Sequence, residues 1–291
     1  MQSALARSRQ IGSRIGLLYA ANTGGAILGA LLAGFYFVPI LGMARPFRIA
    51  AGTNLTIGAI AQFAGSRIAI AGAPSLDDRN QEIDLAPQTL VDARSQRAVL
   101  WTFILSGLLS LALEIVWFRM LVIFLRPTAY AFTLMLASVL AGIAVGSATA
   151  TPLLRRSGPW LAILTLTQLA IGVAAVLSFN LLAKLQTAVD WLGPALTPAG
   201  LDSYFVPILV GGALAMLPTT LLLGFAFPIG LSCWATDDNN RSRRIGTFYS
   251  LNVVGAVVGS ILGGFVLLPF LGSRGSLVAV SSLAVLSSAR F

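Results

Sequence analysis

The sequence predicts an all-helical, polytopic transmembrane bundle with about eight spans. Hydrophobic residues make up 57% of the 291 residues and charged residues only 10%, and the mean hydropathy is +0.87. Soluble domains are about 25% charged on average, so this chain carries too little charge to cover a water-exposed surface. The apolar residues also gather in long runs that short polar segments separate. Both features favour a protein whose main solvent is lipid.

The predicted spans are apolar runs of roughly 20 residues, the length that crosses the hydrocarbon core of a bilayer. In order along the chain they are 16–41, 48–70, 99–124, 129–152, 159–182, 204–233, 247–270 and 275–290. Residues 183–200 favour a short amphipathic helix in the membrane interface, because Leu185, Val189 and Leu192 share one side of it.

The basic residues between the spans predict the orientation of the chain. With the N-terminus in the cytoplasm, the cytoplasmic side holds Arg7, Arg9, Arg14, Arg79, Arg94, Arg97, Arg155, Arg156, Arg241, Arg243, Arg244 and Arg290. The other side holds Arg45, Arg48, Arg126, Lys184 and Arg274. Because cytoplasmic loops are enriched in Lys and Arg, this distribution places both the N-terminus and the C-terminus in the cytoplasm.

The cysteine and histidine contents exclude several kinds of site. Cys233 is the only cysteine and there is no histidine, so no disulfide, Ser-His-Asp triad or HExxH zinc site can form. We therefore expect no catalytic residues, no metal site and no cofactor in this chain. The orientation arginines account for the pI near 11.0, so the lipid bilayer is the expected partner and nucleic acid is not.

Two segments of the chain are copies of one another. Arg14–Gly42 aligns without a gap with Arg244–Gly272, at a constant offset of 230 residues from position 14 to position 244. The identical pairs include Arg14/Arg244, Gly16/Gly246, Tyr19/Tyr249, Asn22/Asn252, Gly25/Gly255, Gly29/Gly259, Gly34/Gly264, Phe35/Phe265, Pro39/Pro269 and Gly42/Gly272. Both copies follow cytoplasmic arginines and run in the same direction. They indicate a parallel repeat, of the kind that relates the two halves of major-facilitator transporters.

The repeat predicts the domain organisation. Residues 1–72 are expected to be the last two spans of a truncated first repeat, and residues 98–291 a second repeat of six spans. Residues 73–97 between them hold half of the acidic residues and are expected to be a polar cytoplasmic linker. About four spans of the first repeat are missing by this count. The chain is therefore expected to be a fragment, or a shortened relative, of a protein with two six-helix halves.

Glu114 is the most distinctive candidate for a ligand or proton site. It lies in the apolar stretch SGLLSLALEIVWFRML, together with the candidates Trp117 and Arg119. A charged side chain at the bilayer centre costs about 2.5–3.5 kcal/mol on insertion scales unless it is paired, protonated or hydrated. Two interpretations remain open: a proton-titrating or cation-binding site, and a structural carboxylate that is neutral or paired with an arginine of another helix.

Polar pairs and glycine strips recur in the repeated segments. Tyr19 and Asn22 stand three residues apart, on one helix face, and so do Tyr249 and Asn252. Each pair is interpreted either as ligand contacts around a central cavity or as interhelical hydrogen bonds. Hydrogen bonding is the favoured interpretation, at about 0.6 kcal/mol for each bond. Glycines spaced by four residues predict close helix packing, and they are Gly25, Gly29, Gly142, Gly146, Gly255, Gly259 and Gly263.

One motif of the second repeat carries a family resemblance. The string Ser-Gly-x-x-x-Leu-Ala-x-Glu-x-x-Trp-x-Arg places Ser106, Gly107, Glu114, Trp117 and Arg119 in one pattern. With the stretches TAYAFTLMLASVLAGIAVGS, LPTTLLLGFAFPIG and RIGTFYSLNVVGAVVGSILGGFVLLPFLG, it resembles the membrane region of bacterial spermidine-synthase-like proteins, which fuse a major-facilitator-like region to a spermidine synthase domain. The resemblance implies a location in the bacterial inner membrane.

The same resemblance implies a soluble neighbour that this chain does not contain. In that family a Rossmann-like aminopropyltransferase domain with a glycine-rich loop follows the membrane helices. No Gly-x-Gly occurs among the 29 glycines of this chain, so the resemblance does not carry the catalytic activity over. It implies instead a spermidine-synthase-like domain as partner, encoded in the same or a neighbouring gene.

Three functions are compatible with these observations. The first is a membrane module of a spermidine-synthase-like, polyamine-related protein that itself lacks the aminopropyltransferase domain. The second is a major-facilitator-type transporter of a small solute such as a polyamine or another cation, which the parallel repeat and Glu114 suggest. The third is a truncated gene product without independent activity, which the missing spans suggest.

Overall fold

The computed structural model describes residues 23–70, 93–126, 128–154, 158–196, 200, 202–234 and 241–288. These residues form helices and turns, and none of them lies in a strand. The chain divides into two compact units, Met1–Asp84 and Leu85–Phe291. The division falls inside the predicted linker 73–97, although residues 93–97 of that linker are already helical.

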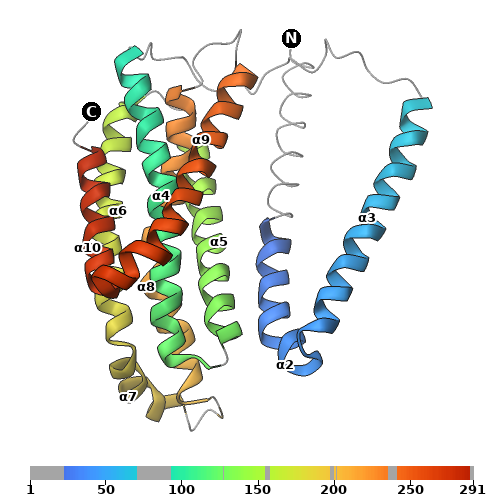
Figure 1. Ribbon diagram of the computed structural model, residues 1–291, viewed down its shortest axis with the longest axis vertical. Helices are drawn as coiled ribbons and strands as arrows, with labels where there is room; N and C mark the ends of the chain where they lie inside the picture. The colour runs from blue at the N-terminus through green and yellow to red at the C-terminus, as the bar shows by residue number, and fades with distance from the viewer. Residues whose placement is uncertain are drawn as a thin grey trace. The chain divides into compact units, whose positions relative to one another are not determined.

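The first unit is a helical hairpin (Figure 1). One arm contains residues 23–32, the π-helical segment η1 (Ala33–Phe37) and the short helix α2 (Val38–Leu41), and the other arm is α3 (Ala44–Ile70). Gly42 joins the arms with φ 70° and ψ −179°, which is a conformation that residues with a Cβ rarely adopt. This glycine therefore permits the tight reversal of the chain.

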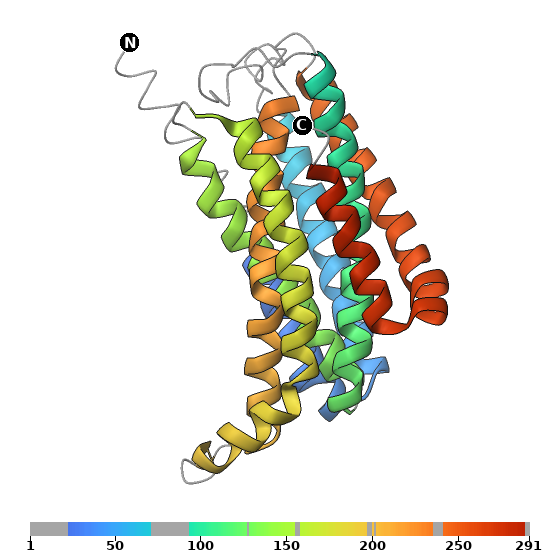
Figure 2. The same cartoon turned by 90° about the vertical axis from the view of Figure 1, so that its left-hand side faces the viewer.

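The second unit is a bundle around a central helix, α4 (Figures 1 and 2). Its elements are α4 (Ala93–Phe124), α5 (Thr128–Leu153), α6 (Trp160–Ala183), α7 (Leu185–Leu196), α8 (Phe205–Trp234), α9 (Arg241–Ile261), η5 (Leu262–Leu267) and α10 (Leu268–Ser288). Helix α4 contacts α5, α6, α8, α9, η5 and α10. The buried side chains form two clusters, one around Trp117 and Leu121 and the other around Phe103 and Phe248.

The two copies of the repeated segment share their local structure. In the second copy η5 (Leu262–Leu267) is π-helical, at the position that η1 occupies in the first copy. Gly272 then takes φ 66° and ψ −179°, which match the angles of Gly42 within a few degrees. The chain turns back at this point, so that α9 and the part of α10 after Gly272 run in opposite directions (Figure 2).

The described residues contain six segments that are long and apolar enough to cross a membrane. They are Thr23–Leu41, Ser95–Phe124, Ala129–Leu153, Trp160–Ala183, Phe205–Trp234 and Arg243–Val285. Such an arrangement fits a helical membrane bundle in a lipid bilayer. The predicted spans 129–152, 159–182 and 204–233 coincide within one residue at each end with α5, α6 and α8.

The count of six differs from the expected eight for two physical reasons. Helix α3 covers the predicted span 48–70, but polar and small residues such as Asn54 and Gln62 lower its hydropathy, and it is not among the six apolar segments. The predicted spans 247–270 and 275–290 form one apolar stretch of 43 residues. A straight helix of that length would measure about 65 Å, roughly twice the hydrocarbon thickness, but the non-helical Gly272 divides it into two arms.

Helix α7 occupies the segment in which an amphipathic helix is expected. Leu185 is buried and Val189 packs against the core, whereas Leu192 is exposed. Helix α8 then begins after Asp202, whose Oδ1 accepts hydrogen bonds from the backbone N–H groups of Tyr204 at 2.9 Å and Phe205 at 2.6 Å. These bonds stabilise the charged form and lower the pKa of the Asp202 carboxyl, as is usual for a capping aspartate.

Candidate functional site

Glu114 lies half-buried in the middle of the central helix α4. Its Oε1 accepts a hydrogen bond from the Ser110 hydroxyl, one turn earlier, at the long distance of 3.5 Å. Within the described part of the chain no arginine or lysine forms an ion pair with this carboxylate. One predicted alternative, pairing with an arginine of a neighbouring helix, is therefore not observed among these residues.

The π-helical segment η5 packs against the stretch of α4 that contains Glu114. A Cβ placed on Gly263 would lie 3.2 Å from the Cα of Ala112, and one placed on Gly264 would lie 4.0 Å from the Cδ1 of Ile115. These two contacts bracket Glu114 along α4. Glu114 itself lies on another face of α4, since it is two positions from Ala112 and one position from Ile115 along the helix. The carboxylate and the π-helical turn thus share a level of the bundle, and because π-helical turns are often found at functional sites, this level is the candidate site.

Trp117 and Arg119 do not join Glu114 in one cluster. Trp117 is buried, and its indole N–H donates a 2.9 Å hydrogen bond to the Ser178 hydroxyl on α6. Ser178 in turn donates to the Ala175 carbonyl at 2.7 Å. Arg119 is exposed on the outside of α4. Trp117 thus joins two helices, and Arg119 does not pair with Glu114.

Asn252 and Tyr249 of the second copy contact helices of the bundle. The Asn252 Nδ2 donates a 2.9 Å hydrogen bond to the Phe103 carbonyl on α4. The Tyr249 ring stacks at a tilt on Phe227 of α8, with 4.9 Å between the ring centroids. Asn252 therefore connects α9 to α4. The corresponding candidates Tyr19 and Asn22 of the first copy lie outside the described residues.

The glycines of the second unit lie where helices approach each other most closely. A Cβ on Gly255 or Gly259 would collide with the carbonyl oxygens of Ile104 or Leu108 on α4, and Gly263 continues this strip. A Cβ on Gly142 or Gly146 of α5 would collide with α8, which these glycines contact. By contrast, the described residues place no atom within 4 Å of a Cβ added to Gly25 or Gly29 of the first unit.

Arg244 opens the second copy of the repeat and holds three helices together. Its Nη1 donates to the Trp234 carbonyl at 3.1 Å and to the Gln96 Oε1 at 3.2 Å, and the Trp234 indole N–H donates back to the Arg244 carbonyl at 3.0 Å. The guanidinium also lies over the Trp234 ring, 5.3 Å from its centroid. The arginine therefore joins the end of α8 to α4 and α9, besides contributing to the charge asymmetry of the loops.

Gln168 is a polar residue that the sequence reasoning does not single out. It lies on α6 with its side chain fully buried, and neither its amide oxygen nor its amide nitrogen has a hydrogen-bond partner among the residues that the structure describes. A buried amide without partners is costly and is usually explained by a bound water or a polar ligand. A signal is present in the sequence, since Gln168 is a single amide within the apolar run WLAILTLTQLAIGVAAVL.

Comparison with known proteins identifies no relative. No family model, no curated protein and no solved structure matches this chain. The resemblance to the membrane region of spermidine-synthase-like proteins therefore stays a prediction, and the chain is described by its helical architecture and the six apolar segments of its described residues.

Proposed function

We propose that the chain is the membrane module of a spermidine-synthase-like, polyamine-related protein, and that Glu114 receives a small organic cation in the bundle. One observation carries this proposal: the carboxylate lies in the central helix, at the level of a π-helical segment, without an ion-pair partner among the described residues. The aminopropyltransferase reaction itself would belong to a separate soluble domain, because the chain has no Gly-x-Gly motif for a nucleotide.

A polyamine suits this environment for a physical reason. The 3.5 Å bond from Ser110 offsets only a small part of the solvation that a carboxylate loses inside a bilayer. An ammonium group would supply an opposite charge and up to three hydrogen-bond donors, and its methylene chain could lie along apolar side chains. Arg119 does not compete for the carboxylate, since it is exposed on the outer face of α4.

Glu114→Gln is expected to weaken spermidine binding by about 10-fold to 100-fold. The substitution preserves the size of the side chain and removes the charge, and a hydrogen bond to a charged group contributes about 1.5–3 kcal/mol. Binding would be measured by isothermal titration calorimetry with the full chain in phosphatidylcholine nanodiscs. Asp190→Asn is the matched control, because it removes one carboxylate from an exposed position on α7. We expect this control to bind like the unmodified protein.

Two outcomes of this titration would contradict the proposal. If the unmodified chain shows no saturable binding of spermidine, the module has no polyamine site. If Glu114→Gln and Asp190→Asn bind spermidine equally well, Glu114 is structural. Circular dichroism of each variant at the same temperature checks that the helices are intact before either conclusion is drawn.

A transporter of the same class of solute is the second candidate function. The shared π-helical turn and the shared glycine angles of the two copies favour it, because transporters are often built from structural repeats around a central site. The unmodified chain, Glu114→Gln and Asp190→Asn in proteoliposomes would distinguish the two candidate functions. Uptake of labelled spermidine that Glu114→Gln abolishes supports transport. Binding of spermidine without uptake supports a module that only presents the solute.

We also propose the bacterial inner membrane as the location, with both termini in the cytoplasm. The excess of arginine on one side of the predicted spans supports this orientation. A reporter enzyme that is active only in the periplasm is expected to stay inactive when fused after Arg243 and to become active when fused after Lys184. The opposite pattern would invert the topology, and activity at both positions would reject the assigned spans.

A further inference from the structure

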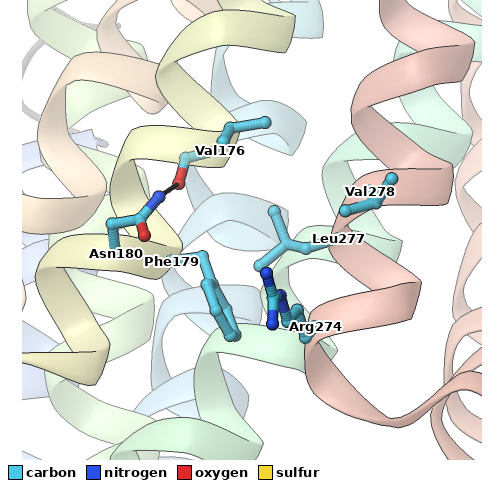
Figure 3. A pocket seen from close by; sticks show the side chains of 6 residues that line it. All are labelled: Val176, Phe179, Asn180, Arg274, Leu277 and Val278. Carbon is cyan, nitrogen blue, oxygen red and sulfur yellow. Dashed lines mark hydrogen bonds between the residues drawn. The ribbon is translucent and has the colours of Figure 1, made fainter.

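A groove lies between helices α6 and α10 on the outside of the second unit. Its volume is about 440 Å³, and its lining consists of Val176, Phe179, Asn180, Arg274, Leu277 and Val278. Val176, Phe179 and Asn180 belong to α6, and Arg274, Leu277 and Val278 belong to α10 (Figure 3). Both helices belong to apolar segments able to cross a membrane, so lipid is the surrounding medium of the groove.

Four of the six side chains that line the groove are apolar. Leu277 is only 2% exposed and forms its floor, whereas Val176 and Val278 are 41% and 56% exposed and form its rims. Phe179 is half-buried beside them. A concave apolar surface of this size falls in the range of small-molecule sites and has the shape and chemistry to hold an acyl chain.

A cationic group stands at one end of the groove. Arg274 begins the returning arm, two residues after the turn at Gly272, and its side chain is exposed. Figure 3 shows it reaching between the two helices toward Phe179, and it forms no hydrogen bond or ion pair with any residue that the structure describes. Its five N–H donors are therefore available, in the fork geometry that binds phosphate.

Two further residues complete a polar end. Asn180 donates from Nδ2 to the Val176 carbonyl at 2.9 Å, which leaves its Oδ1 free to accept a hydrogen bond. Lys184 follows at the end of α6, one turn beyond Asn180, and is exposed. No acidic residue is among the described residues that line the groove. The polar end thus carries positive charge and meets an apolar channel, which is the pattern of a phospholipid with its headgroup and acyl chain.

We propose that this groove binds an anionic phospholipid, whose phosphate pairs with Arg274 and whose acyl chain lies over Leu277 between Val176 and Val278. The apolar floor selects a lipid over a free anion, and the unopposed positive charge selects an anionic headgroup over a zwitterionic one. A basic residue beside the bound headgroup contributes enough attraction for about a fivefold preference. The site is independent of Glu114 and of the function proposed for it.

Native mass spectrometry of the full chain in detergent tests this assignment. We expect phosphatidylglycerol to bind with at least about fivefold preference over phosphatidylcholine. Arg274→Gln should remove that preference, and Val278→Trp should weaken the binding of both lipids by filling the groove from its exposed rim. Arg126→Gln is the matched control, because Arg126 is an exposed arginine that does not line the groove. It should leave lipid binding unchanged.

The competing explanations give different results in the same experiment. Equal losses for Arg274→Gln and Arg126→Gln would show diffuse surface attraction and overturn the site. Unchanged binding in Val278→Trp would overturn the acyl-chain groove. If excess inorganic phosphate displaces the lipid completely from the unmodified protein, the site binds free phosphate and the assignment to a lipid is wrong. Matched helix content by circular dichroism excludes misfolding as the cause of any loss.

Discussion

Replacing Gly259 with alanine is expected to destabilise the second unit by about 1–3 kcal/mol, the usual cost of overpacking a tight interface. A Cβ at this position would collide with the carbonyl oxygen of Leu108, which is backbone and cannot rotate away. Helices α4 and α9 would have to separate. That movement would weaken the 2.9 Å bond from Asn252 to the Phe103 carbonyl in the same interface. Thermal unfolding in detergent, followed by circular dichroism, measures the effect.

The duplicated segment supplies a matched control for this substitution. Gly29 occupies the position of Gly259 in the first copy, but a Cβ added to it would have no atom of the described residues within 4 Å. Gly29→Ala should therefore stabilise the helix by up to about 1 kcal/mol, because alanine has the higher helix propensity. Equal destabilisation by both substitutions would contradict this account and would mean that the first copy also uses its glycines in a close helix interface.

Hydropathy predicts the second unit well because the membrane restricts the possible structures. A chain in lipid must satisfy its backbone hydrogen bonds within each helix, so apolar runs bounded by charge become helices of the same extent. This is why α5, α6 and α8 begin and end within one residue of the predicted spans. The prediction is poorer for α4, which begins at Ala93 and not near residue 99, since a helix can continue beyond the apolar layer into water.

The side-chain partners in the candidate site cannot be predicted in the same way. Trp117 bonds to Ser178, 61 residues away, because α4 and α6 lie side by side, and helix neighbours depend on packing that hydropathy does not describe. Glu114 is identifiable from its cost inside a membrane, but its position at the level of η5 requires the structure. The π-helical turns themselves leave no hydropathy signal, because their residues are as apolar as the helix around them.

Trp117→Ala is expected to lower the free energy of unfolding by about 3–5 kcal/mol, more than Gly259→Ala. The indole is 1% exposed within the buried cluster shared by α4, α5, α6, α8 and α10, so its removal leaves a cavity that rigid neighbours cannot fill. The loss of unfolding free energy would be measured by denaturant titration in mixed micelles. Leu166→Ala on the exposed face of α6 is the control for truncating an apolar side chain that lies outside this cluster.

A double-mutant cycle separates the hydrogen bond of Trp117 from its packing. Trp117→Phe removes the N–H donor, and Ser178→Ala removes the acceptor that it meets at 2.9 Å. We expect a coupling of about 0.6–1.7 kcal/mol between them, the range found for interhelical bonds inside membranes. Ser232→Ala should show no coupling with Trp117→Phe, because the Ser232 hydroxyl donates to the Ile229 carbonyl of its own helix, α8. Zero coupling between Trp117→Phe and Ser178→Ala would mean that Trp117 holds α4 and α6 together through packing alone. The Ser178 hydroxyl would then stabilise only its own helix, by donating to the Ala175 carbonyl.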